Sequence, residues 1–227
     1  GELLTVDRDE IESLRILRRL ISDYDCHASR DARPLNVGVF GPPGAGKSFG
    51  VKEISKAVLG EGDRFLTFNL SQFSDSAALV GALHQVRDKV LAGITPVVFW
   101  DEFDSEHYRW LQYLLAPMND GAFQDGQITH PVGKCVFIFA GATSSDYDSF
   151  GPPNPETLTD SERASLSAAI PGMAERWADF VLKKGPDFKS RLVAFLNVLG
   201  PNPRRVAFLG SDGRRRSKPD PDDLCWP

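Results

Sequence analysis

The sequence is poor in cysteine and contains no long apolar run, and these two absences exclude several classes of protein. Its three cysteines, Cys26, Cys135 and Cys225, are odd in number and lie far apart in a chain of 227 residues. They provide neither a disulfide framework nor a paired zinc motif, so we expect reduced thiols and a cytoplasmic location. No apolar run approaches the roughly 20 residues that cross a bilayer, and the N-terminal residues do not resemble a signal peptide.

Positive charge is not in excess either. The 31 Asp and Glu residues outnumber the 26 Lys and Arg residues, which gives a net charge of −5. This balance argues against a protein whose whole surface binds nucleic acid non-specifically. The net charge does not exclude a local basic patch. Arg214, Arg215 and Arg216 could contact phosphate, although a solvated tail is the favoured interpretation. Nucleic acid is therefore a partner without support in the sequence.

Two common kinds of active site also find no support. The four histidines, His27, His84, His107 and His130, show no mutual spacing typical of a metal site. No Ser/His/Asp arrangement indicates nucleophilic catalysis. The histidines are therefore assigned no role in metal binding or acid–base chemistry.

Short apolar segments alternate with helical patterns along most of the chain. Leu35–Phe40 and Val136–Ala140 are almost wholly apolar and predict buried strands, and residues 9–24 have the spacing of an amphipathic helix. Asp125-Gly126 predicts a β-hairpin. This alternation predicts an α/β fold in which a mostly parallel sheet lies between two helical layers. Further strands are expected at 64–70, 96–100 and 192–199, and further helices from residue 47, at 77–92, at 106–118 and over 161–180 with an interruption at Pro171-Gly172.

A glycine-rich turn follows the first strand. Gly41-Pro42-Pro43-Gly44-Ala45-Gly46-Lys47-Ser48 matches the P-loop pattern G-x-x-x-x-G-K-[ST], between a predicted strand and a predicted helix. Main-chain N–H groups can wrap a polyphosphate only where glycines permit the backbone conformation, and the helix N-terminus adds free donors. Lys47 would contact the β- and γ-phosphates and Ser48 would bind Mg²⁺. The pattern predicts a P-loop nucleoside triphosphatase.

A second motif ends the strand at residues 96–100. Asp101 and Glu102 follow this apolar strand, which is a Walker B pattern. Parallel strands place their carboxyl ends beside the phosphate loop, where such sheets bind ligands. Asp101 would then hold Mg²⁺ and Glu102 would orient and deprotonate the attacking water. Asp104, in the same run, is interpreted as the N-cap of the next helix.

With both motifs in place, roughly residues 5–203 resemble the AAA+ ATPases. The segment 136–144 (VFIFAGATS) is similar to the sensor 1 strand of that superfamily, and the resemblance implies that Thr143 or Ser144 contacts the γ-phosphate or the water. Asn69 matches a polar position that can restrain the catalytic glutamate, although an Asn that closes a strand is most often a turn former. ATP rather than GTP is expected from the resemblance and from the lack of an Asn-Lys-x-Asp motif.

The hairpin and sensor 1 region resembles the branch of Clp-type unfoldases and enhancer-binding activators. The pore loop of the former and the Gly-Ala-Phe loop of the latter have no counterpart in this sequence. Phe73 could substitute as a pore residue, but a core position is favoured. Lys184 to Leu192 is similar to the arginine-finger segment of Clp-type members, so Arg191 is either a finger that acts on a neighbour or an arginine that caps a helix C-terminus.

The expected organisation is an N-terminal helix and linker at 1–34, an AAA+-type core at 35–203, and a polar basic tail or lid remnant at 204–227. The family's helical lid would be missing or truncated, and Arg204 and Arg205 match its sensor 2 arginine by residue type only. We expect the polar chain from Gly210 to be poorly ordered. The favoured function is an ATP-hydrolysing, ring-forming motor that remodels a protein partner. A slow nucleotide-gated switch and a DNA-associated helper ATPase remain alternatives.

Overall fold

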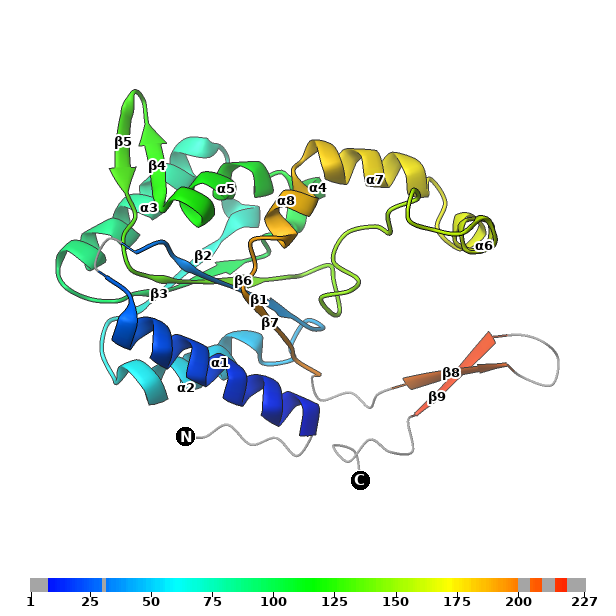
Figure 1. Ribbon diagram of the computed structural model, residues 1–227, viewed down its shortest axis with the longest axis horizontal. Helices are drawn as coiled ribbons and strands as arrows, with labels where there is room; N and C mark the ends of the chain where they lie inside the picture. The colour runs from blue at the N-terminus through cyan, green and yellow to red at the C-terminus, as the bar shows by residue number, and fades with distance from the viewer. Residues whose placement is uncertain (1–7, 30–31, 200–204, 210–214, 220–227) are drawn as a thin grey trace.

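The computed structural model describes residues 8–29, 32–199, 205–209 and 215–219. Its centre is a sheet of five strands in the order β2-β3-β6-β1-β7, and all four neighbouring pairs are parallel. The predicted α/β fold with three layers is thereby confirmed (Figure 1). The strands are β1 (Leu35–Phe40), β2 (Phe65–Asn69), β3 (Val97–Asp101), β6 (Val136–Ala140) and β7 (Ala194–Asn197).

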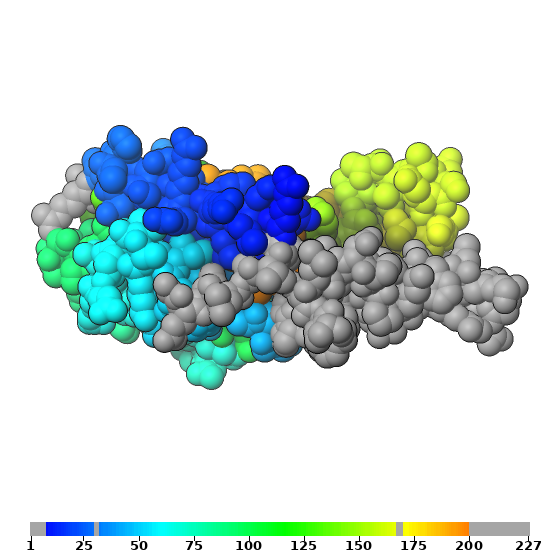
Figure 2. Space-filling view, turned by 90° about the horizontal axis from the view of Figure 1, so that it is seen from below, coloured from blue at the N-terminus to red at the C-terminus, as the bar shows by residue number. Residues whose placement is uncertain are grey.

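Side chains that alternate along the central strands supply two separate cores. In β6, Val136 and Ile138 join the core under α1 (Arg8–His27) and α2 (Lys47–Leu59). Phe137 and Phe139 point to the other face, where α3 (Ser76–Leu91) and α5 (Leu111–Asp120) pack. Because both faces are covered, the central strands are almost wholly apolar, which is why the sequence marks them so clearly. Figure 1 shows α1 and α2 on one face of the sheet, and Figure 2 shows the two helices side by side at the surface.

The predicted hairpin stands away from the main sheet. It consists of β4 (Ala122–Asp125) and β5 (Ile128–Pro131), which pair in antiparallel register. Gly126 at the turn has a φ of 59°, a conformation that glycine adopts without strain. The hairpin lies beside α3 and α5 (Figure 1).

The helix predicted at residues 106–118 is wrong as a single element. The chain forms a short α4 (Ser105–Tyr108) and then α5, and Glu106, His107 and Tyr108 have φ values of 51°, 53° and 62°. A right-handed helix cannot continue through left-handed residues, so the two helices are separate. Tertiary packing explains the departure, since the Tyr108 ring meets Phe180 at 4.9 Å between centroids.

The C-terminal part agrees with the predicted interruption at Pro171-Gly172. Helix α6 (Asp160–Ala169) begins with a capping box between Thr159 and Glu162, and α7 (Met173–Leu182) follows the break. The sequence did not predict α8 (Gly185–Lys189), a short helix that contains both Gly and Pro. A β-carbon on Gly185 would lie 2.1 Å from the Phe180 ring, so this close contact requires glycine.

Regular structure also appears where the chain was expected to be poorly ordered. Strands β8 (Arg205–Leu209) and β9 (Arg215–Pro219) form an antiparallel pair, which corrects the expectation for the residues after Gly210 that are described. Within the described ranges no helical lid follows β7. Arg204, Arg214 and Cys225 lie outside the described residues, while Cys26 and Cys135 are free thiols. Among the helices that are described, none has the length and apolarity of a membrane span.

Candidate nucleotide site

The two predicted motifs meet at one edge of the sheet. Ala140 of β6 pairs with Val39 of β1 on one side and with Asp101 of β3 on the other. The glycine-rich loop leaves β1 at this edge, so it is separated from Asp101 only by β6. Two strand spacings amount to about 10 Å, a gap that one metal-bound phosphate chain can bridge.

The loop at residues 41–46 depends on its glycines. Gly44 and Gly46 have φ values of 76° and 83°, which side chains rarely permit. Gly41 has a φ of 147°, and a β-carbon there would lie 2.4 Å from the carbonyl oxygen of Val198. The pattern of glycines in the sequence therefore has a direct structural cause at each position.

The N-terminus of α2 offers free donors to an anion. Gly46 at its N-cap provides no side-chain hydrogen bond, and the first turn contains no acidic residue. The first N–H groups of a helix have no partner within it, and the helix dipole favours negative charge there. Ser48 lies exposed in this first turn. This end of α2 is therefore chemically suited to a phosphate group.

Lys47 lies over the loop, near the acidic residues. Its Nζ donates hydrogen bonds to the carbonyl oxygens of Gly41 at 2.6 Å and Pro42 at 3.2 Å. Partial burial lowers the pKa of Lys47, and the charges of Asp101 and Asp104 oppose that change. The amine and the Asp101 carboxylate therefore belong to the same electrostatic site, as the two motifs require.

Asp101 and Glu102 occupy the end of β3. The Glu102 N–H donates to Asp101 Oδ1 at 3.2 Å, and Glu102 itself has a φ of 54°. Burial raises the pKa of Asp101, the negative charge of Glu102 adds to this, and Lys47 acts in the opposite direction. A divalent cation would favour the ionised carboxylate, so the donor set of Ser48 and Asp101 fits Mg²⁺.

Asp104 has a different role from the predicted helix cap. Although it occupies the N-cap position of α4, it makes no capping hydrogen bond there. Its carboxylate instead accepts hydrogen bonds from Ala142 N at 2.8 Å, Thr143 N at 3.0 Å and Thr143 Oγ1 at 2.6 Å. Asp104 thus fixes the loop after β6, which carries both sensor 1 candidates, and Ser144 next to Thr143 is buried. Nothing in the sequence spacing indicates this contact.

A family model covers the residues that build this edge. The model of the ATPase family associated with various cellular activities (AAA) matches residues 37–153, which is about half of the chain. The chain belongs to the AAA family. No curated protein sequence matches it.

Solved structures resemble this AAA chain at low sequence identity. A closed-state cryo-EM reconstruction of Hsp104 with ATPγS and FITC casein aligns with a TM-score of 0.50 and 15% identity, over 85% of this chain and 36% of that one. The S. cerevisiae Hsp104–ADP complex aligns with a TM-score of 0.47 and 16% identity, over 85% and 37% of the two chains. At 15% identity, the likeness to the casein-containing Hsp104 structure concerns the fold alone. The AAA chain spans little more than a third of the length of these Hsp104 chains.

Asn69 and Phe73, two further residues of the AAA chain that the sequence singled out, both make contacts within their own chain. Asn69 pairs in register with Asp101, and its Oδ1 accepts hydrogen bonds from Ser71 N at 2.9 Å and Ser71 Oγ at 2.8 Å. Asn69 therefore caps the short 3₁₀ helix η1 (Leu70–Gln72) beside the acidic motif. Phe73 packs against Phe68 and Trp110, which agrees with the favoured core position.

Arg191 lies at the opposite edge of the sheet from the phosphate loop. The N–H of Val193 donates to Asn36 O near the start of β1, whereas the loop follows the end of β1. At about 3.3 Å per strand residue, these two ends of β1 are about 15 Å apart. Arg191 Nη1 donates to the carbonyl oxygen of Asp187 in α8 at 2.6 Å, so within its own chain Arg191 caps this helix.

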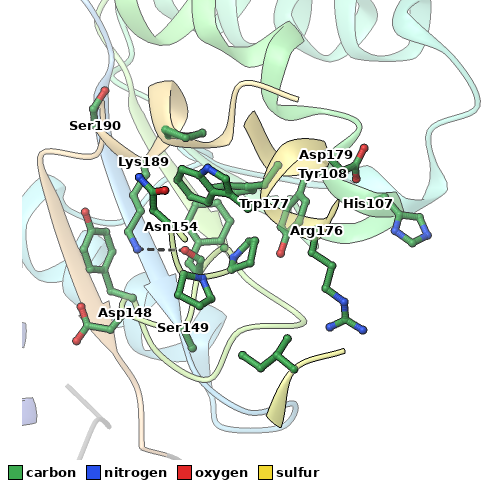
Figure 3. A pocket seen from close by; sticks show the side chains of 18 residues that line it. His107, Tyr108, Asp148, Ser149, Asn154, Arg176, Trp177, Asp179, Lys189 and Ser190 are labelled. Carbon is green, nitrogen blue, oxygen red and sulfur yellow. Dashed lines mark hydrogen bonds between the residues drawn. The ribbon is translucent and has the colours of Figure 1, made fainter. Parts of the chain in front are cut away.

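A large cavity of the AAA chain lies apart from the phosphate loop. It encloses about 1080 Å³ between α4, α7, α8 and residues 147–154 (Figure 3). Tyr108, Trp177 and Phe180 give it aromatic walls, and Arg176 and Lys189 add positive charge. None of residues 41–48 lines it, and neither does Asp101. It is therefore separate from the predicted nucleotide site.

Proposed function

We propose that this AAA protein binds ATP with Mg²⁺ and hydrolyses it to ADP and phosphate. The observation that supports this most is the common location of the glycine-rich loop and Asp101 at one sheet edge, with Lys47 near enough to influence the pKa of Asp101. A site for a triphosphate needs backbone donors, a cation and a metal ligand together. Each of these is available there from the chain's own residues.

Each residue then has a definite task. The N–H groups of residues 41–48 and the Lys47 amine bind the phosphates, and Ser48 and Asp101 hold Mg²⁺, which supplies positive charge against the phosphate oxygens. Glu102 orients the water and accepts its proton. Thr143 or Ser144 contacts the γ-phosphate or this water, and Asn69 restrains Glu102 between turnovers.

Arg191 completes the site of a neighbouring subunit. Its guanidinium is bound to the Asp187 carbonyl of α8, and the chain two residues later pairs near the start of β1, at the end of that strand away from the phosphate loop. An arginine that acts in trans stabilises charge on the transferred phosphoryl group and typically increases the rate by about 10³–10⁵. This role requires a homo-oligomer, and a ring is the arrangement in which every site receives one finger.

The cellular task we propose is remodelling of a protein partner. One of the compared structures contains Hsp104 together with casein, which is a protein. The likeness of fold to Hsp104 therefore favours a protein over a nucleic acid as the partner. A slow switch would instead hold ATP as a monomer, and a DNA-associated ATPase would be stimulated by DNA. Turnover measured with and without DNA, at rising protein concentration, separates these three functions.

The decisive test is an ATPase assay over a range of protein concentrations. We expect specific activity to rise with concentration and to fall by at least about 100-fold in Glu102→Gln, because proton transfer to the base is lost. Glu61→Gln, at an exposed site away from the edge, is the matched control. Wild-type turnover in Glu102→Gln would contradict the assignment of the base.

Mixed oligomers test the action of Arg191 in trans. Arg191→Ala and Lys47→Ala should each be inactive alone. In a mixture, a Lys47→Ala subunit can donate its arginine to an intact Arg191→Ala site, so part of the activity should return. A mixture as inactive as its components, in samples that form mixed oligomers, would argue against a finger in trans.

A further inference from the structure

Three metal-ligand side chains gather on the face of the hairpin that meets α3. His84 belongs to α3, Asp125 ends β4 and His130 lies in β5. His84 is 41 residues before Asp125 in the sequence, so only the fold brings them together. The spacing of the histidines along the sequence gives no sign of this cluster, because His84 and His130 meet Asp125 only in the folded chain.

Their donor atoms lie almost as close as a bound ion requires. The Nε2 atom of His84 and Oδ2 of Asp125 are 3.1 Å apart, and one donor atom from each of the three residues lies within 4.8 Å of the others. An ion with metal–ligand bonds of about 2.0–2.2 Å in tetrahedral geometry holds its donors about 3.3–3.6 Å apart. Small side-chain rotations would therefore close the three donors around one ion.

Packing behind the cluster holds the two imidazoles in position. Phe123 pairs in register with His130, and strand alternation places Phe123 and Asp125 on the same face. The Phe123 ring is buried and meets His84 at 4.9 Å and His130 at 5.4 Å between centroids. The two histidine rings are 5.0 Å apart. An apolar support of this kind fixes ligand orientation before the ion arrives.

The outer side of the cluster is open to solvent. The side chain of His84 is 30% exposed and that of Asp125 is 56% exposed. An ion can therefore enter without unfolding the hairpin, and water can fill a remaining coordination position. Three protein ligands with one open position are common for zinc in proteins.

We propose that His84, Asp125 and His130 form a binding site for Zn²⁺ or a related first-row transition-metal ion. Two imidazole nitrogens and one carboxylate oxygen suit this class of ion, whereas Mg²⁺ requires oxygen ligands. The ligands come from α3 and from both hairpin strands. The bound ion therefore joins the hairpin to the helix, at a place independent of the nucleotide site.

Metal titration of the full chain, prepared without a histidine tag, tests the site. With a chelator competition assay we expect one equivalent of Zn²⁺ to bind tightly, and with Co²⁺ the visible bands of a four-coordinate site with nitrogen and oxygen ligands. His130→Ala should weaken binding by more than the roughly 10–100-fold that loss of an outer-shell partner costs. His107→Ala, at an exposed histidine outside the cluster, should bind as the wild type does.

Two further variants keep the test decisive. If His130→Ala does not fold, Asp125→Asn at the exposed ligand should still weaken Zn²⁺ binding, because an amide is a poorer ligand than a carboxylate. Asp101→Asn should leave it unchanged, which separates this site from the proposed Mg²⁺ site. At 100 times its dissociation constant, Zn²⁺ should raise the folded-to-unfolded ratio about 100-fold in the wild type.

Three results would overturn the proposal. The first is no Zn²⁺ binding, which would leave His84 and Asp125 as a simple hydrogen-bonded pair. The second is equal affinity in wild type, His130→Ala and Asp125→Asn. The third is a thiolate-to-Co²⁺ charge-transfer band, which would assign the bound ion to cysteine instead.

Discussion

Asp101 carries a charge that its surroundings in the folded chain disfavour. Burial raises its pKa, Glu102 adds a second negative charge, and the Lys47 amine compensates only in part. In the folded state the proton therefore binds more tightly than in the unfolded chain. This group stabilises the fold below its unfolded pKa, and the contribution is lost as the pH rises through the folded pKa. Above the folded pKa the ionised carboxylate is a cost to stability, and we propose that this charge serves metal binding.

Replacement of Asp101 should therefore stabilise the nucleotide-free protein. We expect Asp101→Asn to raise Tm at pH 7 by up to about 2–4 °C, since screening at this half-buried group limits the effect to about 1 kcal/mol. The gain should shrink at pH 4, where a larger fraction of the wild-type carboxyl group is protonated. Scanning calorimetry at both pH values measures this. A lower Tm at pH 7, or a larger gain at pH 4, would be inconsistent with the raised pKa.

Asp104 should matter for stability as well as for the sensor 1 loop. In Asp104→Asn one of the two carboxylate oxygens is replaced by an NH₂ group, which would face a donor of Ala142 or of Thr143 at a buried site. We expect a loss of about 1–3 kcal/mol in the free energy of unfolding and slower ATP turnover. Urea denaturation measures the former. Asp88→Asn, at an exposed position of α3, should change neither quantity.

At the scale of single residues, the sequence predicts local chemistry better than contacts between residues that are distant along the chain. The glycines of residues 41–46 and the acids after β3 follow motifs whose spacing reflects one turn or one strand end. Asp104 reaches a loop 38 residues later, and His84 meets Asp125 across 41 residues. No periodicity encodes such pairs, because they depend on how separate elements pack.

The elements themselves were predicted where burial leaves a simple pattern. β1 and β6 are buried along their whole length, so an apolar run is enough to mark them. The failures occurred where tertiary contacts override local preference. The pattern at 106–118 is helical by spacing, yet three residues adopt left-handed conformations while Tyr108 packs on Phe150 and Phe180. α8 is too short to leave a periodic signal.

The left-handed segment before α5 should be a source of strain that glycine relieves. A left-handed conformation costs a non-glycine residue roughly 1–2 kcal/mol. Glycine avoids this cost, but part of the benefit is offset because glycine loses more conformational entropy on folding. His107 is exposed and has a φ of 53°. We therefore expect His107→Gly to raise Tm by up to about 2–4 °C. His107→Ala removes the same imidazole without relieving the backbone, so a matching rise in that variant would contradict the explanation.

Across the whole molecule, aromatic packing joins the C-terminal helices to the sheet. Phe150 lies between Phe40 of β1 and Phe188 of α8, with centroid distances of 5.6 and 6.1 Å. Phe103, which follows the acidic motif, stacks on Phe188 at 5.3 Å. This cluster couples the acidic motif to α8, the helix that holds Arg191. A change at one nucleotide site could therefore be transmitted through a packed core to the residue proposed to act on the next subunit.

Removal of the Phe150 ring should destabilise this connection. Phe150 is 1% exposed, and truncation of a buried Phe to Ala typically costs about 3–5 kcal/mol. We expect Phe150→Ala to lower the free energy of unfolding by this amount, as measured in urea. Leu182→Ala, where the side chain is 71% exposed, should stay within about 0.5 kcal/mol of the wild type. Similar losses in the two variants would argue against a central role for the cluster.

The most direct test of the nucleotide site uses Mn²⁺ in place of Mg²⁺, followed by electron paramagnetic resonance in Glu102→Gln. One Mn²⁺ should bind tightly only when ATP is present and should show magnetic coupling to phosphorus. Adding either Asp101→Asn or Lys47→Ala to this variant should weaken that ATP-dependent binding by at least about 10-fold, since loss of even an outer-shell partner typically costs this much. If Mn²⁺ and ATP bind independently of each other, or if Asp101→Asn binds the ion as tightly as before, the two motifs do not hold a single metal-bound triphosphate.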